Sequence, residues 1–169
     1  MLAEILIIAF VPALLAAAGI WDLASFTIPN FLSVALIGLF AVFAFAAGLT
    51  LPAVGLHLLA GLTGLVLGFG LFALGWIGGG DAKLFAAVTL WLGFHDLMNY
   101  ALLASVFGGV LTLALLALRR WQLPAPLVRQ AWALRLHDAR SGIPYGVALA
   151  IGALVLLPGT EVFRLAIAA

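Results

Sequence analysis

Long apolar runs separated by short polar stretches set the pattern of this chain. Most runs approach the roughly 20 residues that a helix needs to cross the hydrocarbon core of a bilayer. Strands of a membrane barrel would instead alternate polar and apolar residues at every second position. The pattern therefore predicts an all-α integral membrane protein, a bundle of about six transmembrane helices in one polytopic domain over residues 1–169. The expected spans are residues 2–20, 31–49, 54–76, 81–92, 99–118 and 143–157, with an extension of the last to 168 left open.

The composition agrees with this pattern and excludes several classes of site. Hydrophobic residues make up 67% of the chain and charged residues 8%, whereas a soluble domain carries about 25% charged residues. The formal net charge of +1 does not indicate the strongly basic surface that binds nucleic acid. Because the chain has no cysteine, it contains no disulfide, no thiolate zinc site and no cysteine nucleophile. Six acids and three histidines remain as candidate catalysts.

The first apolar run has a competing interpretation as a secretory signal peptide, because Ala16–Ala18 resembles a cleavage site. No Lys or Arg precedes the run, however, and Glu4 lies where a signal peptide carries positive charge. We therefore expect a retained transmembrane helix that ends at Trp21 and Asp22. Pro29 disfavours helix at the residue before it, so a polar loop or interfacial turn is expected at Ile28–Asn30.

Basic residues predict the orientation of the spans. With six spans, the loops after the first, third and fifth lie on one side, and they hold nearly all of the Lys and Arg. These residues are Lys83, Arg119, Arg120, Arg129, Arg135 and Arg140. The opposite loops contain His57, His95 and Asp96 without Lys or Arg, and Arg164 near the C-terminus is the exception. The bias places Asp22, Asp81 and the Arg-rich segment 119–140 in the cytoplasm, together with four of the five tryptophans.

The stretch from Trp76 to Lys83 is the most unusual part of the chain. Asp81 lies at the end of a hydrophobic run, where an acid is costly and by default functional. Gly78, Gly79 and Gly80 precede it and remove every side chain from its approach, so that backbone can turn there or come close to another chain. The sequence thus predicts a glycine loop carrying an acid at the cytoplasmic end of the fourth helix.

Asp22 and Asp81 are the two acids that the predicted topology places at cytoplasmic helix ends. Two neighbouring carboxylates in a poorly hydrated setting cannot both ionise cheaply, and so they share a proton. An aspartic protease uses such a pair: one carboxylate draws a proton from water, and its protonated partner stabilises the carbonyl oxygen. The alternative is two structural acids at helix ends, one of which caps the fourth helix.

Three motifs resemble one family. Gly78-Gly79-Gly80-Asp81-Ala82-Lys83-Leu84 is similar to the GxGD motif of prepilin and preflagellin peptidases. Asp22 followed by Ile28-Pro29-Asn30 resembles the region around the first aspartate of that family. Ser141-Gly142-Ile143-Pro144-Tyr145-Gly146 resembles the proline-containing start of its last helix. The motifs occur in the family order along the whole chain and fall on one predicted face.

The resemblance implies an aspartyl endopeptidase that removes short, basic leader peptides from type IV prepilins at the cytoplasmic face of the inner membrane. Asp22 and Asp81 would be its catalytic pair, and Gly78 and Gly80 would give the substrate backbone room. It implies no cofactor and no metal. The chain lacks the paired-cysteine insert of the larger bifunctional members and is short for their N-methyltransferase region. It therefore resembles the compact members that serve Flp/Tad pili, or a preflagellin-type relative.

Several neighbouring residues have two interpretations each. Lys83 either reaches lipid headgroups or meets substrate. Asn30, Pro144, Tyr145 and Gly146 are either groups that support the aspartates or a turn and an interfacial aromatic. The Arg-rich segment 119–140 is expected at the membrane surface, and its charge would repel a basic leader.

Two further predictions concern the remaining polar residues. Asp138 is expected to be a local partner of Arg135 or Arg140 rather than a site that recruits the leader. His57, His95 and Asp96 lie on the face opposite the two aspartates, so we exclude a metal site that combines them with the pair.

Three rival functions remain at this point. A small transporter or channel subunit would use Asp22 and Asp81 to relay protons or hold a cation, but it favours acids near the bilayer midplane and internal repeats. A non-catalytic scaffold of a pilus or secretion system would tolerate loss of either acid. A protease of the presenilin or signal-peptide-peptidase type shares the acid chemistry but places the acids deeper in longer chains.

Overall fold

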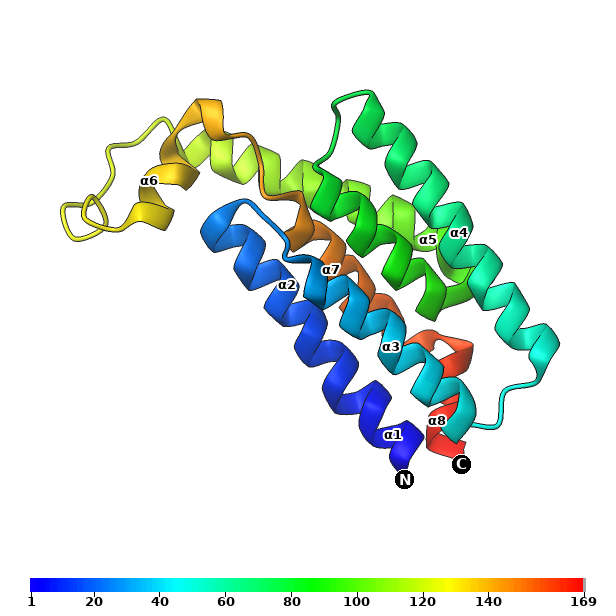
Figure 1. Cartoon of the computed structure of the whole chain (residues 1–169). Coiled ribbons are helices and arrows are strands. Elements are labelled where there is room, and N and C mark those ends of the chain that lie inside the picture. Colours follow the sequence, from blue (N-terminus) through cyan, green and yellow to red (C-terminus); the bar gives the residue numbers. More distant parts are fainter. Residues whose placement is uncertain (169) are drawn as a thin grey trace.

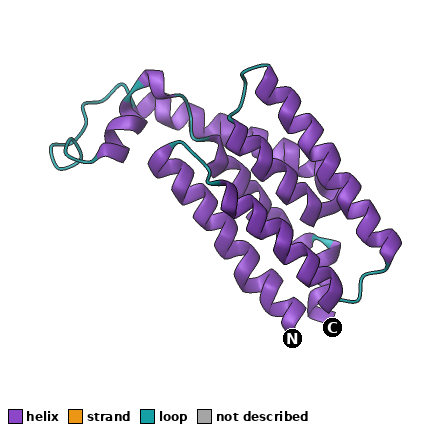
Figure 2. Cartoon of the chain, viewed as in Figure 1, coloured by secondary structure: helices purple, strands orange, loops and turns teal. Residues whose placement is uncertain are grey.

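The computed structural model describes residues 1–168, and within that range every regular element is helical, with no strand (Figures 1 and 2). The prediction of an all-α chain is confirmed. The elements are α1 (Leu2–Ile5), η1 (Leu6–Phe10), α2 (Val11–Ser25), α3 (Asn30–Ala46), α4 (Leu51–Ala73), α5 (Gly79–Leu118), α6 (Ala131–His137), η2 (Ala139–Ser141), α7 (Tyr145–Leu156), η3 (Leu157–Gly159) and α8 (Glu161–Ala168).

Three helices in residues 1–168 are long and apolar enough to cross a membrane. They are Leu2–Ser25 with 24 residues, Leu51–Ala73 with 23 and Gly79–Leu118 with 40. A fourth candidate joins Tyr145–Gly159 to Glu161–Ala168 across a bend of 50°. α3 is apolar but shorter, at 17 residues.

The first helix extends further than the hydrophobic pattern predicts. It continues through α1, η1 and α2 to Ser25, and Phe26 ends it in the left-handed conformation with φ 57°. Asp22 therefore lies inside the last turn of α2 and not in the following loop. The apolar run stops at Ile20, but Leu23 and Ala24 are still compatible with a helix, so the polar residues mark the interface rather than the helix end.

α5 contains a reversal of the chain at Gly93. This residue has φ 72° and ψ −177°, which a side chain would disfavour, and helix resumes at once with Phe94. The predicted end of the fourth helix at residue 92 agrees with this break, whereas the predicted start of the next helix at residue 99 is too late. The His57 ring lies on Gly93, and its Nδ1 is 2.8 Å from the Leu90 carbonyl oxygen.

α4 packs antiparallel on the first half of α5 through small residues. A β-carbon at Gly61 would lie 3.1 Å from Leu90 Cβ, and one at Gly68 would lie 3.0 Å from Ala82 Cα. A β-carbon at Gly64 would overlap Thr89 Oγ1. These glycines therefore let the two helices approach closely, which is the ordinary role of small residues in membrane helices.

α7 packs antiparallel on the second half of α5. The Tyr145 ring covers Gly108, and Gly152 lies against Ala104 and the Tyr100 ring. The predicted sixth span, 143–157, thus corresponds to a helix from Tyr145 to Leu156, and Pro158 follows in the turn before α8. The open extension to residue 168 is present as a separate, bent helix.

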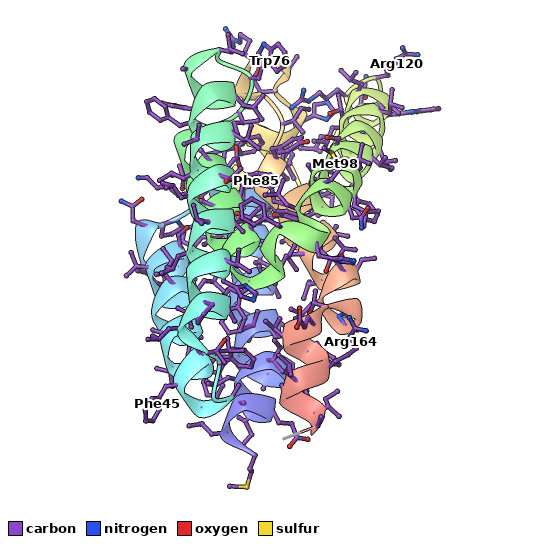
Figure 3. The ribbon with its side chains drawn as sticks, turned by 90° about the vertical axis from the view of Figure 1, so that its right-hand side faces the viewer. Phe45, Trp76, Phe85, Met98, Arg120 and Arg164 are labelled. Carbon is purple, nitrogen blue, oxygen red and sulfur yellow. The ribbon has the colours of Figure 1, made fainter. Side chains whose placement is uncertain are left out.

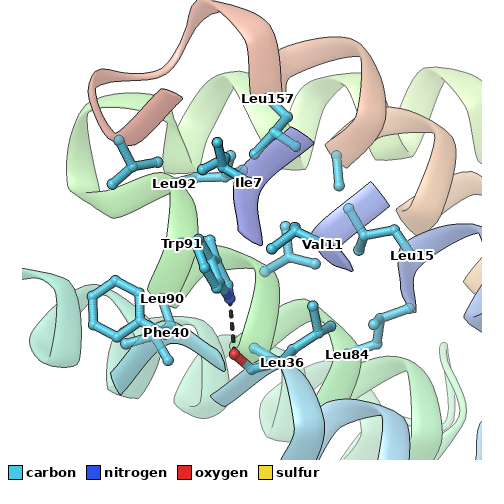
Figure 4. Packing of buried hydrophobic residues seen from close by; sticks show 14 of the residues in the cluster. Ile7, Val11, Leu15, Leu36, Phe40, Leu84, Leu90, Trp91, Leu92 and Leu157 are labelled. Atoms are coloured by element: carbon cyan, nitrogen blue, oxygen red, sulfur yellow. Dashed lines mark hydrogen bonds between the residues drawn. The ribbon is translucent and has the colours of Figure 1, made fainter. Parts of the chain in front are cut away.

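The hydrophobic core lies where α1–α2, α3, α5 and α7 meet. Trp91 is 1% exposed, and its indole Nε1–H donates to the Leu36 carbonyl at 2.9 Å (Figure 4). Phe40 and Phe43 pack against the Trp91 ring with centroid separations of 5.4 and 5.2 Å. Trp91 is thus the one tryptophan of the five that is not predicted to lie at the cytoplasmic face.

Trp76 and Arg120 lie at the same end of the molecule, and Phe45 lies at the other (Figure 3). The chain reaches the Trp76 end three times, at the end of α2, between α4 and α5, and between α5 and α7. The segment around α6 extends from the bundle at this end (Figure 1). The loops that carry most basic residues therefore gather at one end, as their predicted placement on one face requires.

Candidate active site

Asp22 is held at the junction of α2 and α7. Its side chain is buried, with 4% of the residue exposed. The Gly146 N–H, in the first turn of α7, donates to Asp22 Oδ2 at 2.7 Å. A carboxylate at a helix N-terminus satisfies a backbone donor that has no partner within the helix. The chain thus ties its first motif to its last motif across 124 residues of sequence.

Asp81 lies in the first turn of α5 and is 8% exposed. Its Oδ2 accepts the Gly78 N–H at 2.8 Å, three residues back along the chain. This contact is a helix cap, so the structure shows the capping role that the sequence leaves open for one of the two acids. Capping occupies one carboxylate oxygen, which is compatible with chemistry at the other.

The expected glycine loop is shorter than the sequence predicts. Gly75 makes the turn after α4 with φ 74°, and Gly78 is extended with φ −74° and ψ 157°. Gly79 and Gly80 are already helical. The sequence predicts a loop at all three glycines because consecutive glycines disfavour helix. In the structure the Asp81 cap stabilises the first turn of α5, so Gly79 and Gly80 are part of that helix.

Ile28 lies between the start of α5, which bears Asp81, and the start of α7, whose Gly146 amide binds Asp22. A β-carbon at Gly80 would lie 3.1 Å from Ile28 Cβ, and one at Gly146 would lie 2.5 Å from Ile28 Cδ1 and 2.9 Å from Asp22 Oδ2. The loop after α2 therefore passes between the starts of α5 and α7 and draws them together. The structure thus brings the two predicted acids into one buried cluster.

Lys83 and Asn30 meet beside this cluster. Lys83 Nζ donates to Asn30 Oδ1 at 2.9 Å, linking α5 to the first residue of α3. Among the ion pairs of the described chain, none joins Lys83 to an acid, as expected from its position two residues after Asp81. Asn30 is therefore more than a turn former, since it holds the only lysine of the chain.

The start of α7 contributes Pro144, Tyr145 and Gly146. Pro144 caps the helix, and the Gly146 amide binds Asp22. The Tyr145 ring instead covers Gly108 on α5, so this aromatic positions α7 on α5.

Two residues near the acids were not predicted. The sequence predicts Ile28 only as part of a turn, although its position before Pro29 in an apolar setting is the signal that it packs inward. Tyr100 is fully buried, stacks on Phe85 with centroids 5.1 Å apart and donates its hydroxyl to the Leu149 carbonyl at 3.3 Å. A buried tyrosine in an apolar helix needs such a partner, but the sequence does not identify it.

The Arg-rich segment is fastened to the same end of the bundle. Arg119 donates to the Leu136 and Gly142 carbonyls, each at 2.8 Å. Asp138 accepts the Arg140 N–H at 2.9 Å and lies 3.4 Å from Arg140 Nε, which confirms the predicted local partner. The Arg140 amide and guanidinium together lower the pKa of Asp138 below its ordinary value.

The opposite end carries a separate polar cavity of about 340 Å³. It is lined in part by His57, His95, Asp96, Glu161 and Arg164. His95 Nδ1 lies 3.1 Å from Asp96 Oδ1. Within residues 1–168 no group of three His, Cys, Asp or Glu side chains is arranged to hold a metal ion.

Comparison with known proteins gives one match. Residues 9–113, more than half of the chain, match the profile of the type IV leader peptidase family. This range includes both aspartates and the glycine stretch. Searches of curated proteins and of solved structures gave no significant match.

Proposed function

Because this chain belongs to the type IV leader peptidase family, we propose that it is a membrane-embedded aspartyl endopeptidase. Its proposed reaction is removal of a short, basic leader from Flp-type prepilins at the cytoplasmic face of the inner membrane. The family and the apolar helices make the chain a multi-pass membrane protein with prepilin-like substrates. The aspartic mechanism, the Flp-type substrate and the orientation are the new parts of the proposal.

The pair Asp22 and Asp81 carries the proposal. Both carboxylates are buried at one end of the bundle, and each accepts a backbone N–H at the start of a helix, from Gly78 before α5 and from Gly146 in α7. They come from segments 59 residues apart that the Ile28 loop holds together. Neither carboxylate has an Arg or Lys partner among the ion pairs of the described residues. A buried acid pair without counter-ions is suited to proton transfer.

In the proposed mechanism one carboxylate takes a proton from water, and the water oxygen attacks the carbonyl carbon of the scissile peptide. The protonated partner donates its proton to the carbonyl oxygen, which gives a tetrahedral diol. Collapse of the diol returns one hydroxyl proton to that partner and breaks the C–N bond. The first carboxyl group then donates its proton to the leaving nitrogen, and both acids return to their starting state.

The neighbouring residues have supporting roles in this proposal. Gly78, Gly79 and Gly80 keep side chains away from the path to Asp81, and the Gly146 amide fixes Asp22. Asn30 and Lys83 close the side of the cluster next to α3. Ile28 lies between the starts of α5 and α7. The substrate backbone therefore reaches the acids only after the Ile28 loop moves.

We further propose six membrane crossings with the acid cluster in the cytoplasm. The reversal at Gly93 divides α5 into two crossings, α3 makes a short one, and α7 with α8 makes the last. Basic residues gather at the Trp76 end, and basic loops are retained on the cytoplasmic side. The acids then lie at the cytoplasmic ends of α2 and α5, a position that does not suit a transporter site at the midplane.

Cleavage of a co-expressed Flp-type prepilin tests this function. Wild type, Asp22→Asn and Asp81→Asn are first brought to equal amounts in the membrane, and the pilin is then resolved by size. We expect wild type to remove the leader and both variants to leave it in place. A scaffold or a transporter subunit would leave the prepilin intact even with wild-type protein, and normal cutting by either variant would make that acid structural.

A further inference from the structure

An apolar groove runs along the bundle between α3 and α4, with α5 as its floor. It encloses about 510 Å³. We call it the α3–α4 groove. Its walls are formed mainly by Val34, Ile37, Leu58, Leu62 and Leu65, and Leu90 lies in its floor. Both α3 and α4 pack on α5, which holds the walls apart at a fixed spacing.

The walls are exposed to the surroundings. Val34 on α3 is 65% exposed and Leu62 on α4 is 56% exposed. No element of residues 1–168 covers these side chains. In a membrane the alternatives are lipid and the apolar helix of another protein, because both suit an apolar wall.

The groove has one polar end, and that end lies beside the acid cluster. Lys83 and Asn30 line it and are joined by their 2.9 Å hydrogen bond. Lys83 follows Asp81 by two residues, and Asn30 follows Ile28, which packs on Gly80, by two residues. The polar end of the groove thus lies two residues along the chain from both Asp81 and Ile28, although the Lys83 side chain leaves α5 on a different side from that of Asp81.

The positive charges near the polar end of the groove determine which part of a substrate can bind in it. The Lys83 ammonium at the polar end has a neutral amide as its partner and repels a basic leader. The Arg-rich segment at the same end repels the leader as well. A substrate that is itself a membrane protein also carries an apolar segment, which in this proposal follows the scissile bond and matches the apolar walls.

We propose that the α3–α4 groove binds this apolar segment as a helix and so sets the distance between the bilayer and the cut. The inference rests on the proposed function and adds the place where the substrate is held. A helix is about 10 Å wide, so one face of it enters and the rest contacts lipid. The arrangement is a helix-in-groove contact of the kind that uses apolar residues three and four apart.

Bulky substitutions test whether the groove is occupied. Val34→Trp and Leu62→Trp fill it, whereas Val66→Trp on the same α4 helix is 64% exposed and lies outside the lining, so it is the control. In liposomes containing full-length prepilin, we expect at least a tenfold lower kcat/KM for the two groove variants, mainly through KM. The control is expected to cut at the wild-type rate.

Cross-linking gives a second measurement that does not depend on turnover. Because the chain has no cysteine, a single Leu62→Cys substitution can be combined with Asp81→Asn, which leaves the substrate uncut. A prepilin with one cysteine in its apolar segment is expected to form a disulfide with Leu62→Cys and not with Val66→Cys.

The outcomes separate the two proposals. If wild type cuts, the aspartate variants fail, and the groove variants cut normally without a cross-link, the groove proposal is wrong and the peptidase proposal stands. If the groove variants instead lose a bound phospholipid in native mass spectra without a change in kcat/KM, lipid is the occupant and our inference is overturned. If wild type leaves prepilin uncut and no cross-link forms, both proposals fail.

Discussion

At the residue scale, the acid cluster depends on places where a side chain is missing. Gly80 and Gly146 both face Ile28, and Gly146 also faces the Asp22 carboxylate. The Ile28 contacts thus bring together the start of α5, which bears Asp81, and the start of α7, whose Gly146 amide binds Asp22 of α2.

Gly146→Ala is expected to lower kcat on prepilin about 10²-fold, because a misplacement of roughly 1 Å can have that effect on a catalytic group. The added β-carbon would lie 2.9 Å from Asp22 Oδ2 and would displace either the carboxylate or Ile28. Initial rates on purified protein measure the change. Gly109→Ala, which meets nothing within 4 Å, is the control and should keep the wild-type rate. Equal rates for the two variants would mean that this contact does not position Asp22.

The sequence predicts much of this site at the residue scale. Asp22, Asp81 and Gly146 are identified by their motifs, and the structure places them together. Ile28 and Tyr100 are not identified, because an apolar or aromatic residue in a membrane helix gives no sign of which neighbour it meets. That information lies in the helix packing, which no local pattern contains.

At the element scale, the antiparallel pair of α4 and the first half of α5 fixes the start of α5 and thus Asp81. The contacts of Gly61, Gly64 and Gly68 with α5 show that the glycine-rich face of α4 is the packing surface of this pair. The chain reversal at Gly93 was placed correctly at its first residue but not at its last, since His95 and Asp96 look like loop residues and yet continue a helix.

Gly64→Ala is expected to destabilise the protein by about 1–3 kcal/mol, the range for overpacking a close interface. The new β-carbon would overlap Thr89 Oγ1 and lie 3.0 Å from Thr89 Cβ, so rotation of the Thr89 side chain does not relieve it. Thermal unfolding in detergent measures the loss. Gly70→Ala in the same helix meets nothing within 4 Å and should be neutral or stabilising. Unchanged stability of the Gly64 variant would show that α4 and α5 can move apart.

The turn at Asp138 should be sensitive to acid. Folding lowers the pKa of Asp138 below its ordinary value of 3.8. The ionised carboxylate therefore stabilises the turn fully at pH values above 3.8. This stabilisation is lost as the pH falls through the lower pKa of the folded chain. Hydrogen exchange of the Arg140 amide is expected to speed up over this acid range beyond the change in intrinsic rate. Asp138→Asn should remove most of that extra pH dependence, whereas an unchanged profile in the variant would exclude Asp138 as its cause.

At the scale of the whole molecule, the fold brings three distant motifs and the basic loops to one end of an apolar bundle. Hydropathy predicts the spans and basic residues predict the common face, because both depend on the bilayer and not on detailed packing. The α3–α4 groove could not be predicted in this way, since it arises from the spacing of two helices on a third.

Cysteine labelling tests the orientation of the whole chain. Ala125 and Leu51 are exposed at opposite ends and can each be replaced by Cys in the cysteine-free background. A membrane-impermeant maleimide added to spheroplasts is expected to label Leu51→Cys at once and Ala125→Cys only after lysis. The reverse order would place the acid cluster outside the cytoplasm and would contradict the proposed site of cleavage.

The most direct measurement is the turnover rate of purified protein on prepilin for wild type, Asp22→Asn, Asp81→Asn and Asp96→Asn. Asp96 is as buried as Asp81 but lies at the opposite end, which makes it a matched control. Loss of an essential acid or base should lower kcat by about 10²–10⁴-fold or more in the first two variants, while Asp96→Asn keeps the wild-type rate. If either Asp22→Asn or Asp81→Asn cuts at the wild-type rate while folded, the two carboxylates do not form the catalytic pair and the central claim is wrong.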